Sequence, residues 1–552
     1  MQKHYFKFLF LLITISFIDF NLYAQLPQCE RGVNFADLDI NNVKARHWAS
    51  GNMWYDTYYH LPHYEVPKGS GKHSLFSFDF WFGAVDEMGR RRTAFQTYSG
   101  SQSTTGHTYF PGPLDDIGDT FVEICAYYDR VWKINKSTLD SFRLGLLTKV
   151  PKDILEWPAR NNPHIPFSPE GDLAPFQDAN GDNNYNPMDG DIPEILGDQT
   201  LWWSFNDKGG YGSPYAETTL QIDGWAMAYA YNSIPELQNH TFYKYSFANK
   251  SNLRLDSVMV GMFIESDLGQ FDDDFVGCDT VRNMGIFYNG DPDDGEYGTD
   301  IPMVGLKILQ GTQEEKEEDI YSDMYTCWFR GKNWATWGLP EHERSAFNGL
   351  WGLGGDGRAM TYGGNGLGSG DSPTTLHMYP SDPTDSEGWS ECSENNMPSD
   401  RHLVMSVGPT TMQHLEKREL HFAVLWVEED VNYPCPSFAP LQEAADFVQN
   451  MFDNGLITNI EENPISSYQN SQIRLFPNPA TSNSVLYLEQ KQGLQKGTLQ
   501  LFDSLGKLVK SATLKENRQN EVQLSDLQSG IYFYELQWRN GSVENGKVVV
   551  HF

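Results

Sequence analysis

The chain has 552 residues, of which 39% are hydrophobic and 14% aromatic, and its formal net charge is −34 at pH 7. Single hydrophobic cores stop growing at roughly 250–300 residues, so this length predicts several domains. The acidic balance argues against a nucleic-acid-binding protein, because phosphate contacts require clustered Lys and Arg.

Residues 1–24 have the pattern of a secretory signal peptide. Two lysines open the segment, an apolar run fills 8–18, and Ala24 offers the small residue that signal peptidase requires. We therefore predict entry into the Sec translocon and cleavage between Ala24 and Gln25. The apolar run is shorter than the about 20 residues that span a bilayer, although an uncleaved anchor is the alternative. No later stretch of the sequence is long and apolar enough to cross a membrane.

Alternating hydrophobicity predicts a body that is mainly β, with few helices. Phenylalanines at every second position of 76–82 indicate a strand with one buried face, and 93–98 can return as its hairpin partner. Further strands are predicted at 225–231, 241–247, 257–265, 403–407 and 420–427. The best helix is 440–454, where apolar residues recur at i, i+3, i+4 and i+7 and Gly455 follows as the cap.

We divide the body into two β-rich sandwich regions, 25–200 and 201–460, followed by a polar linker at 461–472. Residues 471–552 carry a net charge of +2 and the signal segment +1, which leaves −37 for the body. This change in net charge marks a domain boundary. All six cysteines lie in the body, where 15 disulfide connectivities are possible and free buried thiols are equally open.

One acidic loop has the spacing of a twelve-residue calcium loop. Positions 1, 3, 5, 7, 9 and 12 are Asp178, Asn180, Asp182, Asn184, Asn186 and Asp189. Calcium requires six to eight hard oxygen ligands, and this spacing wraps them around one point. Asn183 stands where Gly is usual, and Asn tolerates positive φ better than most residues. We predict a structural Ca²⁺ ion; the alternative is a loop of Asx turns without a metal.

No catalytic pattern is complete. Glu341-His342 lacks the second histidine of a zinc-peptidase helix, and the residues before Ser369 do not form a nucleophile elbow. Trp202, Trp203, Trp225 and Trp328 could stack on sugar rings, although core positions are commoner for tryptophan in β-sandwiches.

The C-terminal segment 473–552 reads as a small immunoglobulin-like β-sandwich of short strands separated by turns. Four ordered segments, 475–480, 501–507, 527–533 and 547–550, resemble the type A C-terminal sorting domain of the type IX secretion system. The residues that match its motifs are Pro477, Asn478, Pro479, Gly506, Gly530 and Tyr532. The chain departs from the family pattern by ending in His551-Phe552 rather than in a basic residue. An ordinary terminal domain that helps adhesion or packing is the alternative.

This resemblance implies transport to the periplasm and then passage through the outer membrane by the type IX machinery. It also implies that a sortase-like peptidase removes the domain within the linker, after which the body is released or attached to surface lipopolysaccharide. The body itself resembles a family of large exported bacterial proteins through segments 66–73, 80–86, 109–115, 197–207 and 274–279. That family implies no activity.

Two functions follow from the sequence. The first is a cell-surface or extracellular adhesion or binding protein, stabilised by calcium, with a glycan or protein as ligand. The second is a secreted hydrolase of polysaccharide or protein. A pocket with close carboxylates and an exposed tryptophan would favour the hydrolase, whereas a flat sandwich with buried tryptophans would favour the binder.

Overall fold

The computed structural model describes residues 29–552, except 57, 97–108, 210–218, 313–323, 332–335, 339–342, 429–432, 458–472, 477–479, 482–484, 491–494, 503–506, 526, 528–529, 540–542 and 552. The predicted signal peptide, its cleavage site at Ala24 and Gln25, and the linker therefore lie outside the described residues. Within the described part of the chain, no helix has the length and apolar character needed to cross a membrane.

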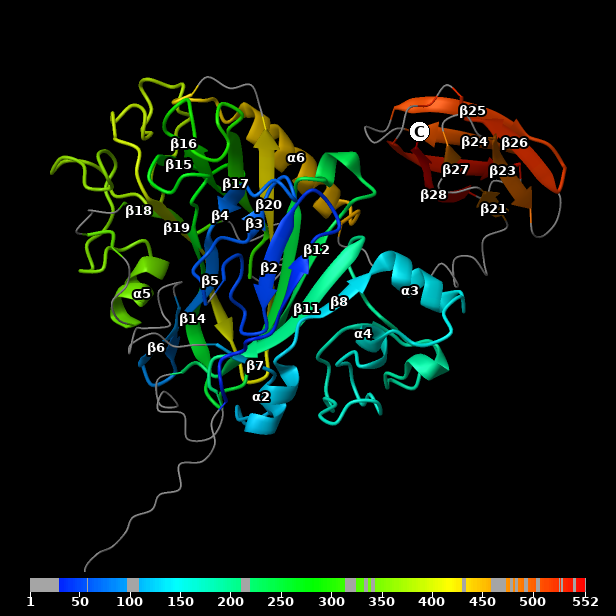
Figure 1. Ribbon diagram of the computed structural model, residues 1–552, viewed down its shortest axis with the longest axis horizontal. Coiled ribbons are helices and arrows are strands. Elements are labelled where there is room, and N and C mark those ends of the chain that lie inside the picture. The colour runs from blue at the N-terminus through cyan, green and yellow to red at the C-terminus, as the bar shows by residue number, and fades with distance from the viewer. Residues whose placement is uncertain are drawn as a thin grey trace, which may run out of the picture.

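Two large antiparallel sheets form the body (Figure 1). The five-stranded sheet has, in spatial order, β18 (Thr326–Gly331), β19 (Arg401–Met412), β14 (Leu255–Glu265), β5 (Ser77–Asp86) and β6 (Arg91–Ala94). The nine-stranded sheet has β15 (Asp274–Asp279), β16 (Met284–Asn289), β17 (Pro302–Gln310), β20 (Lys417–Glu428), β13 (Thr241–Asn249), β12 (Ile222–Ala230), β11 (Gln199–Asn206) and β7 (Phe110–Pro111), with β8 (Trp132–Asn135) also pairing with β11.

Smaller elements surround these sheets. A four-stranded sheet contains β1 (Phe35–Leu38), β2 (Lys44–Trp48), β3 (Tyr64–Glu65) and β4 (His73–Leu75), and a two-stranded sheet contains β9 (Phe176–Gln177) and β10 (Ile192–Pro193). The helices are α2 (Val122–Tyr128), α3 (Lys136–Arg143), α4 (Lys152–Leu155), α5 (Glu343–Leu350) and α6 (Ala439–Asp453), with short 3₁₀ turns η2 (Pro187–Asp189) and η3 (Pro235–Leu237).

The main core lies between the facing sides of the two large sheets. Phe78 and Phe80 of β5 point inward, and the Phe78 ring stacks on Phe422 of β20 with ring centroids 5.2 Å apart. Phe80 packs edge-to-face on Tyr245 of β13 at 4.1 Å. The predicted alternation in β5 is thereby confirmed. The expectation that only one face of this strand is buried is wrong, because α5 covers the other face.

The sheets also correct the predicted division of the body at residue 200. β5 comes from the first predicted region, yet it pairs directly with β14 from the second. In the same way β8 pairs with β11, and both regions contribute to one core. Residue 200 is therefore not a boundary between separate cores, since the hydrogen-bonded ladders run across it.

All six cysteines are paired. The disulfides are Cys29–Cys125, Cys278–Cys327 and Cys392–Cys435, with Cα atoms 5.7, 6.5 and 6.1 Å apart. Cys278–Cys327 joins β15 of the nine-stranded sheet to β18 of the five-stranded sheet, so it closes one side of the sandwich. Three such bonds suit an oxidising compartment outside the cytoplasm.

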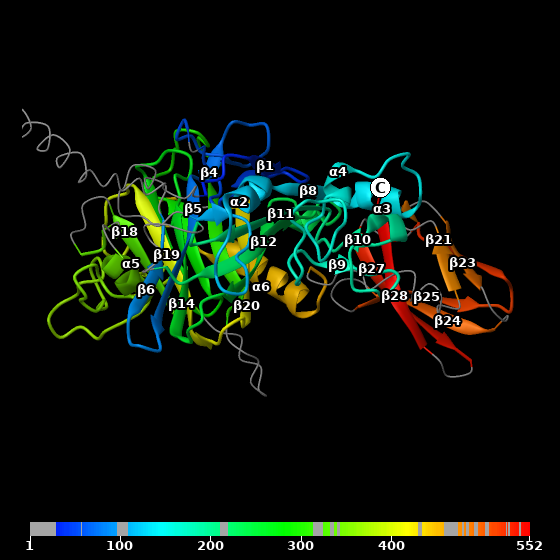
Figure 2. The ribbon, with the colours of Figure 1, turned by 90° about the horizontal axis from the view of Figure 1, so that it is seen from below.

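The C-terminal region forms its own β-sandwich, with a core separate from that of the body (Figure 2). One sheet contains β21 (Ile473–Phe476), β23 (Val485–Gln490) and β26 (Gln519–Gln523). The other contains β22 (Ala480–Thr481), β28 (Val543–His551), β27 (Gly530–Trp538), β24 (Gly497–Phe502) and β25 (Leu508–Leu514). The predicted fold class, mainly β with a terminal immunoglobulin-like sandwich, is confirmed.

Candidate functional site

The outer face of the nine-stranded sheet changes from apolar to polar along its strands. Toward one end, side chains such as Met227 and Phe242 are covered by the second core cluster, to which α6 contributes. Toward the other end, register aligns Trp225 with Ser246 and Ser246 with Glu419 across β12, β13 and β20. Paired residues of antiparallel strands project to the same side. These side chains therefore form a polar strip on one face.

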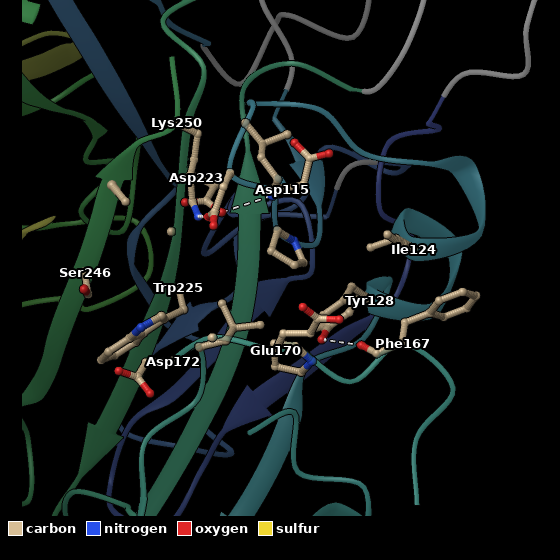
Figure 3. Close-up of a pocket in the computed structure, with 18 of the residues that line it drawn as sticks. Asp115, Ile124, Tyr128, Phe167, Glu170, Asp172, Asp223, Trp225, Ser246 and Lys250 are labelled. Atoms are coloured by element: carbon tan, nitrogen blue, oxygen red, sulfur yellow. Dashed lines mark hydrogen bonds and ion pairs between the residues drawn. The ribbon is translucent and has the colours of Figure 1, made fainter. Parts of the chain in front are cut away.

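This strip forms the floor of a cavity of about 540 Å³. Its walls come from segments 113–116 and 166–173, and from α2 through Ile124 and Tyr128. The Tyr128 hydroxyl donates a hydrogen bond to the Phe167 carbonyl (3.1 Å) and so ties α2 to the opposite wall (Figure 3). We call this cavity the groove. Its volume is in the range of small-molecule binding sites.

Trp225 is the aromatic centre of the groove. Its side chain is half-buried, lies beside Asp172 (Figure 3), and has the Lys244 ammonium 5.7 Å from its ring centroid. The other tryptophans considered for sugar stacking, Trp202, Trp203 and Trp328, are buried in the two body cores. The expectation that such tryptophans are core residues is therefore confirmed for those three but not for Trp225.

Asp223 lies on the groove floor with only 5% of its surface exposed. Burial raises the pKa of this carboxyl to about 6, although the Lys250 ammonium and the N–H of Leu114 favour its charged form. That N–H donates to Asp223 Oδ2 at 3.0 Å. The group can therefore hold a proton at mildly acidic pH and release it near neutrality.

Several other charges in the groove have ionic partners. The Lys250 ammonium contacts Asp116 at 2.9 Å, and Arg160 contacts Asp172 at 2.8 Å. At the end of the strip, hydrogen bonding to His421 and the nearby Lys244 ammonium outweigh burial and lower the pKa of Glu419 to about 2. The groove thus presents an aromatic face, fixed carboxylates and paired ammonium groups to a ligand.

A local pattern in the sequence corresponds to the floor of the groove. In β12, β13 and β20, polar residues occupy outward positions where the same strands elsewhere carry apolar ones: Asp223, Lys244, Ser246, Glu419 and His421. None of these five residues was predicted from the sequence, which pointed only to their neighbour on the floor, Trp225. The groove walls lie far away in the chain, and no local pattern connects them to the floor.

The predicted calcium loop lies in the insertion between β9 and β10. Asp178 accepts backbone N–H bonds from Asn180, Gly181 and Asn183, and Asn183 has a φ of 65°, as its position requires. Successive Asx turns follow, in which Asn180 Oδ1 accepts from the Asp182 N–H (2.9 Å). The loop therefore has the local turns that both calcium binding and the metal-free alternative require.

The later ligand positions are also placed by hydrogen bonds. Asn184 accepts from Asn161 Nδ2, and Asn186 Nδ2 donates to Asp189 Oδ2 at 2.6 Å. Asp191, which the sequence analysis did not select, is fully buried and accepts from the Ala179 and Asn186 N–H groups, both at 2.8 Å.

Asp191 closes this calcium-type loop. Burial raises its pKa, and the carboxylates of Asp178 and Asp182 add to that rise. Three acidic groups therefore share one neighbourhood there. Their mutual distances exceed those of a closed metal cluster, because the described residues hold such a group within 4.8 Å only at Glu265, Asp400 and His402. Calcium binding stays a prediction.

The sorting-motif residues are described only in part. Pro477, Asn478, Pro479 and Gly506 lie outside the described residues. Gly530 begins β27, and Tyr532 two positions later is 7% exposed and belongs to the core of the C-terminal sandwich. The glycine-x-tyrosine segment thus places its aromatic residue inside the domain.

Comparisons with known proteins identify the C-terminal domain. Residues 474–551 match the family described as the secretion system C-terminal sorting domain. The chain therefore carries a C-terminal sorting domain of the type IX secretion system, which implies export to the cell surface or the extracellular space. No curated protein matches the chain in sequence.

Similar solved structures have low identity. An immunoglobulin-like β-sandwich protein from Bacteroides vulgatus is 15% identical, covers 15% of this chain and 85% of its own, and has a TM-score of 0.13. A polysaccharide lyase is 10% identical over 59% of this chain and 34% of its own, with a TM-score of 0.16. Dimeric latent PorU from Porphyromonas gingivalis is 9% identical over 64% of this chain and 31% of its own, with a TM-score of 0.14. These scores carry no conclusion about function.

Proposed function

We propose that this chain is a cell-surface or extracellular binding protein that takes a carbohydrate into the groove. The signal segment directs the chain to the periplasm, where the type IX machinery recognises the sorting domain. A sortase-like peptidase then cuts within 461–472, and the body is released or joined to lipopolysaccharide. The sorting domain and the three disulfides support a destination outside the cell.

The observation that carries the carbohydrate proposal is the half-buried Trp225 on the groove floor. A sugar ring has an apolar face that packs on an aromatic ring, while its hydroxyls require hydrogen-bonding groups at the edge. Asp172 and Ser246 supply such groups around the indole. A purely apolar ligand would shield those groups from water without forming hydrogen bonds to them, which costs binding free energy.

Calcium has a structural role in this proposal, held by Asp178, Asn180, Asp182, Asn184, Asn186 and Asp189. The loop supports the groove wall through short contacts. The Tyr185 N–H donates to the Arg160 carbonyl (2.8 Å), and the Arg160 side chain pairs with Asp172, which lines the groove. Ordering of the loop by Ca²⁺ should therefore fix the position of Asp172.

A second candidate is a secreted hydrolase of polysaccharide, favoured by Asp223. A buried carboxyl with a pKa raised to about 6 can donate a proton to a leaving group, while an ionised carboxylate assists from the other side. Glu170 and Asp172 line the same groove. Incubation of the protein with polysaccharides, followed by assay of reducing ends, distinguishes turnover from binding alone.

The test of the binding proposal is a panel of oligosaccharides and polysaccharides titrated against the mature protein and Trp225→Ala. Loss of the ring should weaken binding at least about tenfold, or about 1.4 kcal/mol. Trp351→Ala is the matched control, because Trp351 is also half-buried but packs beside Tyr325, outside the groove. Equal affinity of Trp225→Ala and the unaltered protein would place the ligand elsewhere.

A further inference from the structure

The groove contains more acidic than basic side chains. Two ammonium groups line it, those of Lys250 and Lys417. The carboxyl groups that line it belong to Asp115, Asp116, Glu170, Asp172 and Asp223. Arg160 pairs with Asp172 from outside the lining, which reduces this acidic excess without reversing it. The groove therefore attracts cations and repels anions, and the net charge of −34 of the whole chain acts in the same direction.

Asp223 is the buried carboxyl group of the groove floor. It is only 5% exposed, yet it lines the groove. Its Oδ2 accepts the hydrogen bond from the Leu114 N–H at 3.0 Å, and no hydrogen bond from a described residue reaches its Oδ1. Because its pKa is about 6, the group is mostly ionised at pH 7. The floor thus holds a nearly buried anion with one oxygen that can still accept a hydrogen bond from a ligand.

The two ammonium groups of the groove have other partners. Lys250 Nζ contacts Asp116 at 2.9 Å. Lys417 Nζ donates to the backbone carbonyl of Asp172 at 3.4 Å. Both favour the charged form of Asp223 from a distance, but in the described part of the chain no cationic side chain forms an ion pair with it. A buried carboxylate without a countercharge is costly, so a cationic group of a ligand would be stabilised there.

Asp223 and Trp225 lie two positions apart on β12, and both line the groove (Figure 3). Residues i and i+2 of a strand project to the same face, about 6–7 Å apart. A sugar ring that stacks on the indole can therefore bring one of its substituents to the carboxylate. Ala248 lies opposite Asp223 on β13, and its small side chain leaves the carboxylate open to the groove.

From this geometry we propose that the groove selects carbohydrates that carry a protonated amine on the sugar ring, and that this amine pairs with Asp223 while the ring stacks on Trp225. The inference rests on the proposed carbohydrate function and specifies its ligand class, an amino sugar whose nitrogen is not acetylated. A hydroxyl or an N-acetyl group can donate a hydrogen bond to the carboxylate but leaves its charge uncompensated. An ammonium group does both, and such charge-assisted hydrogen bonds are roughly twice as strong as neutral ones.

Glu170 supplies a further carboxylate on the groove wall. Its side chain is exposed, and within the described ranges it forms no hydrogen bond or ion pair. An oligomer of amino sugars carries one amine on each ring, so a neighbouring ring can offer its amine to Glu170. A polymer of uronic acids or sulfated sugars would place anions against the same carboxylates and be repelled. The groove therefore discriminates among carbohydrates by the sign of their charge.

The test titrates the mature protein at pH 7 with tetrasaccharides of the same linkage that differ only at C2, which carries an amine, an N-acetyl group or a hydroxyl. The amine form should bind at a single site, at least about tenfold more tightly than the hydroxyl form, and high salt should reduce this preference. Asp223→Asn should abolish the preference by weakening only the amine form. Asp356→Asn is the matched control, because it removes the same charge from an exposed position outside the groove, and it should keep the preference.

The titrations of the unaltered protein decide the question even if Asp223→Asn fails to fold. Equal binding of the three forms, lost in Trp225→Ala, would overturn the inference and leave the proposed carbohydrate function intact. Binding of none of them, in both the glucose and the galactose series, would overturn both. A preference for the amine form that persists in folded Asp223→Asn would overturn the pairing. Tighter binding of a lysine tetrapeptide would instead assign the groove to basic peptides and would also overturn the inference.

Discussion

The substitution Asp223→Asn should raise the free energy of unfolding near neutral pH, because it removes the cost of burying a carboxylate in the groove. Asp223 is almost fully buried, and its pKa rises from 3.8 to about 6 because burial disfavours the carboxylate. Asparagine has nearly the same shape and keeps an oxygen that can accept from the Leu114 N–H. The substitution therefore removes the charge with little change in packing.

The raised pKa fixes the sign and size of the effect. Between pH 4 and pH 6 the folded chain holds a proton that the unfolded chain has lost, so stability falls as pH rises through this window. At 1.36 kcal/mol per pKa unit, the rise from 3.8 to about 6 corresponds to about 3 kcal/mol. Asp223→Asn should match the unaltered protein at pH 4 and exceed its stability by up to about 3 kcal/mol at pH 7.5.

Urea unfolding followed by tryptophan fluorescence measures this difference. The signal reports the body, because Trp538 is the one tryptophan among 15 that lies in the C-terminal domain. Asp356→Asn is the control, since Asp356 is exposed and pairs with Arg358, which lowers its pKa. That substitution should give no gain at pH 7.5. A stability difference for Asp223→Asn that is the same at pH 4 and pH 7.5 would refute the reasoning.

Three further predictions concern stability. Chelation of Ca²⁺ should lower the melting temperature of the protein but not that of Asp178→Asn, and an equal loss in both would count against the loop as a calcium site. The double substitution Cys278→Ser and Cys327→Ser should cost about 4 kcal/mol in the chain-entropy model, because the bond closes a loop of 49 residues; an unchanged urea midpoint would argue against a role in joining the sheets. A methyl group at Gly261 would lie 2.4 Å from Leu350 Cδ2, so Gly261→Ala should cost about 1–3 kcal/mol. Leu350→Ala in the same chain should make that substitution cheaper, and strictly additive losses in thermal unfolding would contradict direct overlap.

Local patterns in the sequence were sufficient to predict the main strands and the last helix. The predicted strands at 241–247 and 257–265 became β13 and β14, and the helix at 440–454 became α6, followed by Gly455 with a φ of 68°. These elements are coded by alternation or by helical spacing over about ten residues. The hairpin partner predicted at 93–98 begins earlier, because β6 pairs over Arg91–Ala94, and residues 97 and 98 lie outside the described residues.

Features that depend on distant partners were not predictable. The division at residue 200 failed because no local signal tells which strand lies beside β5. The disulfide pairing was open among 15 connectivities, since a bond such as Cys29–Cys125 depends on how α2 packs. The groove likewise joins residues that lie far apart in the chain, from Pro113 to Lys417.

In the proposed function, the C-terminal sandwich directs export and the body is the part that is exported. Expression of the full chain and of a chain ending at Ser467, in a bacterium with a working type IX system, tests this most directly. The full chain should reach the cell surface or the medium, with a new C-terminus within 461–472, while the shortened chain should stay in the periplasm. Equal export of both chains would contradict the account.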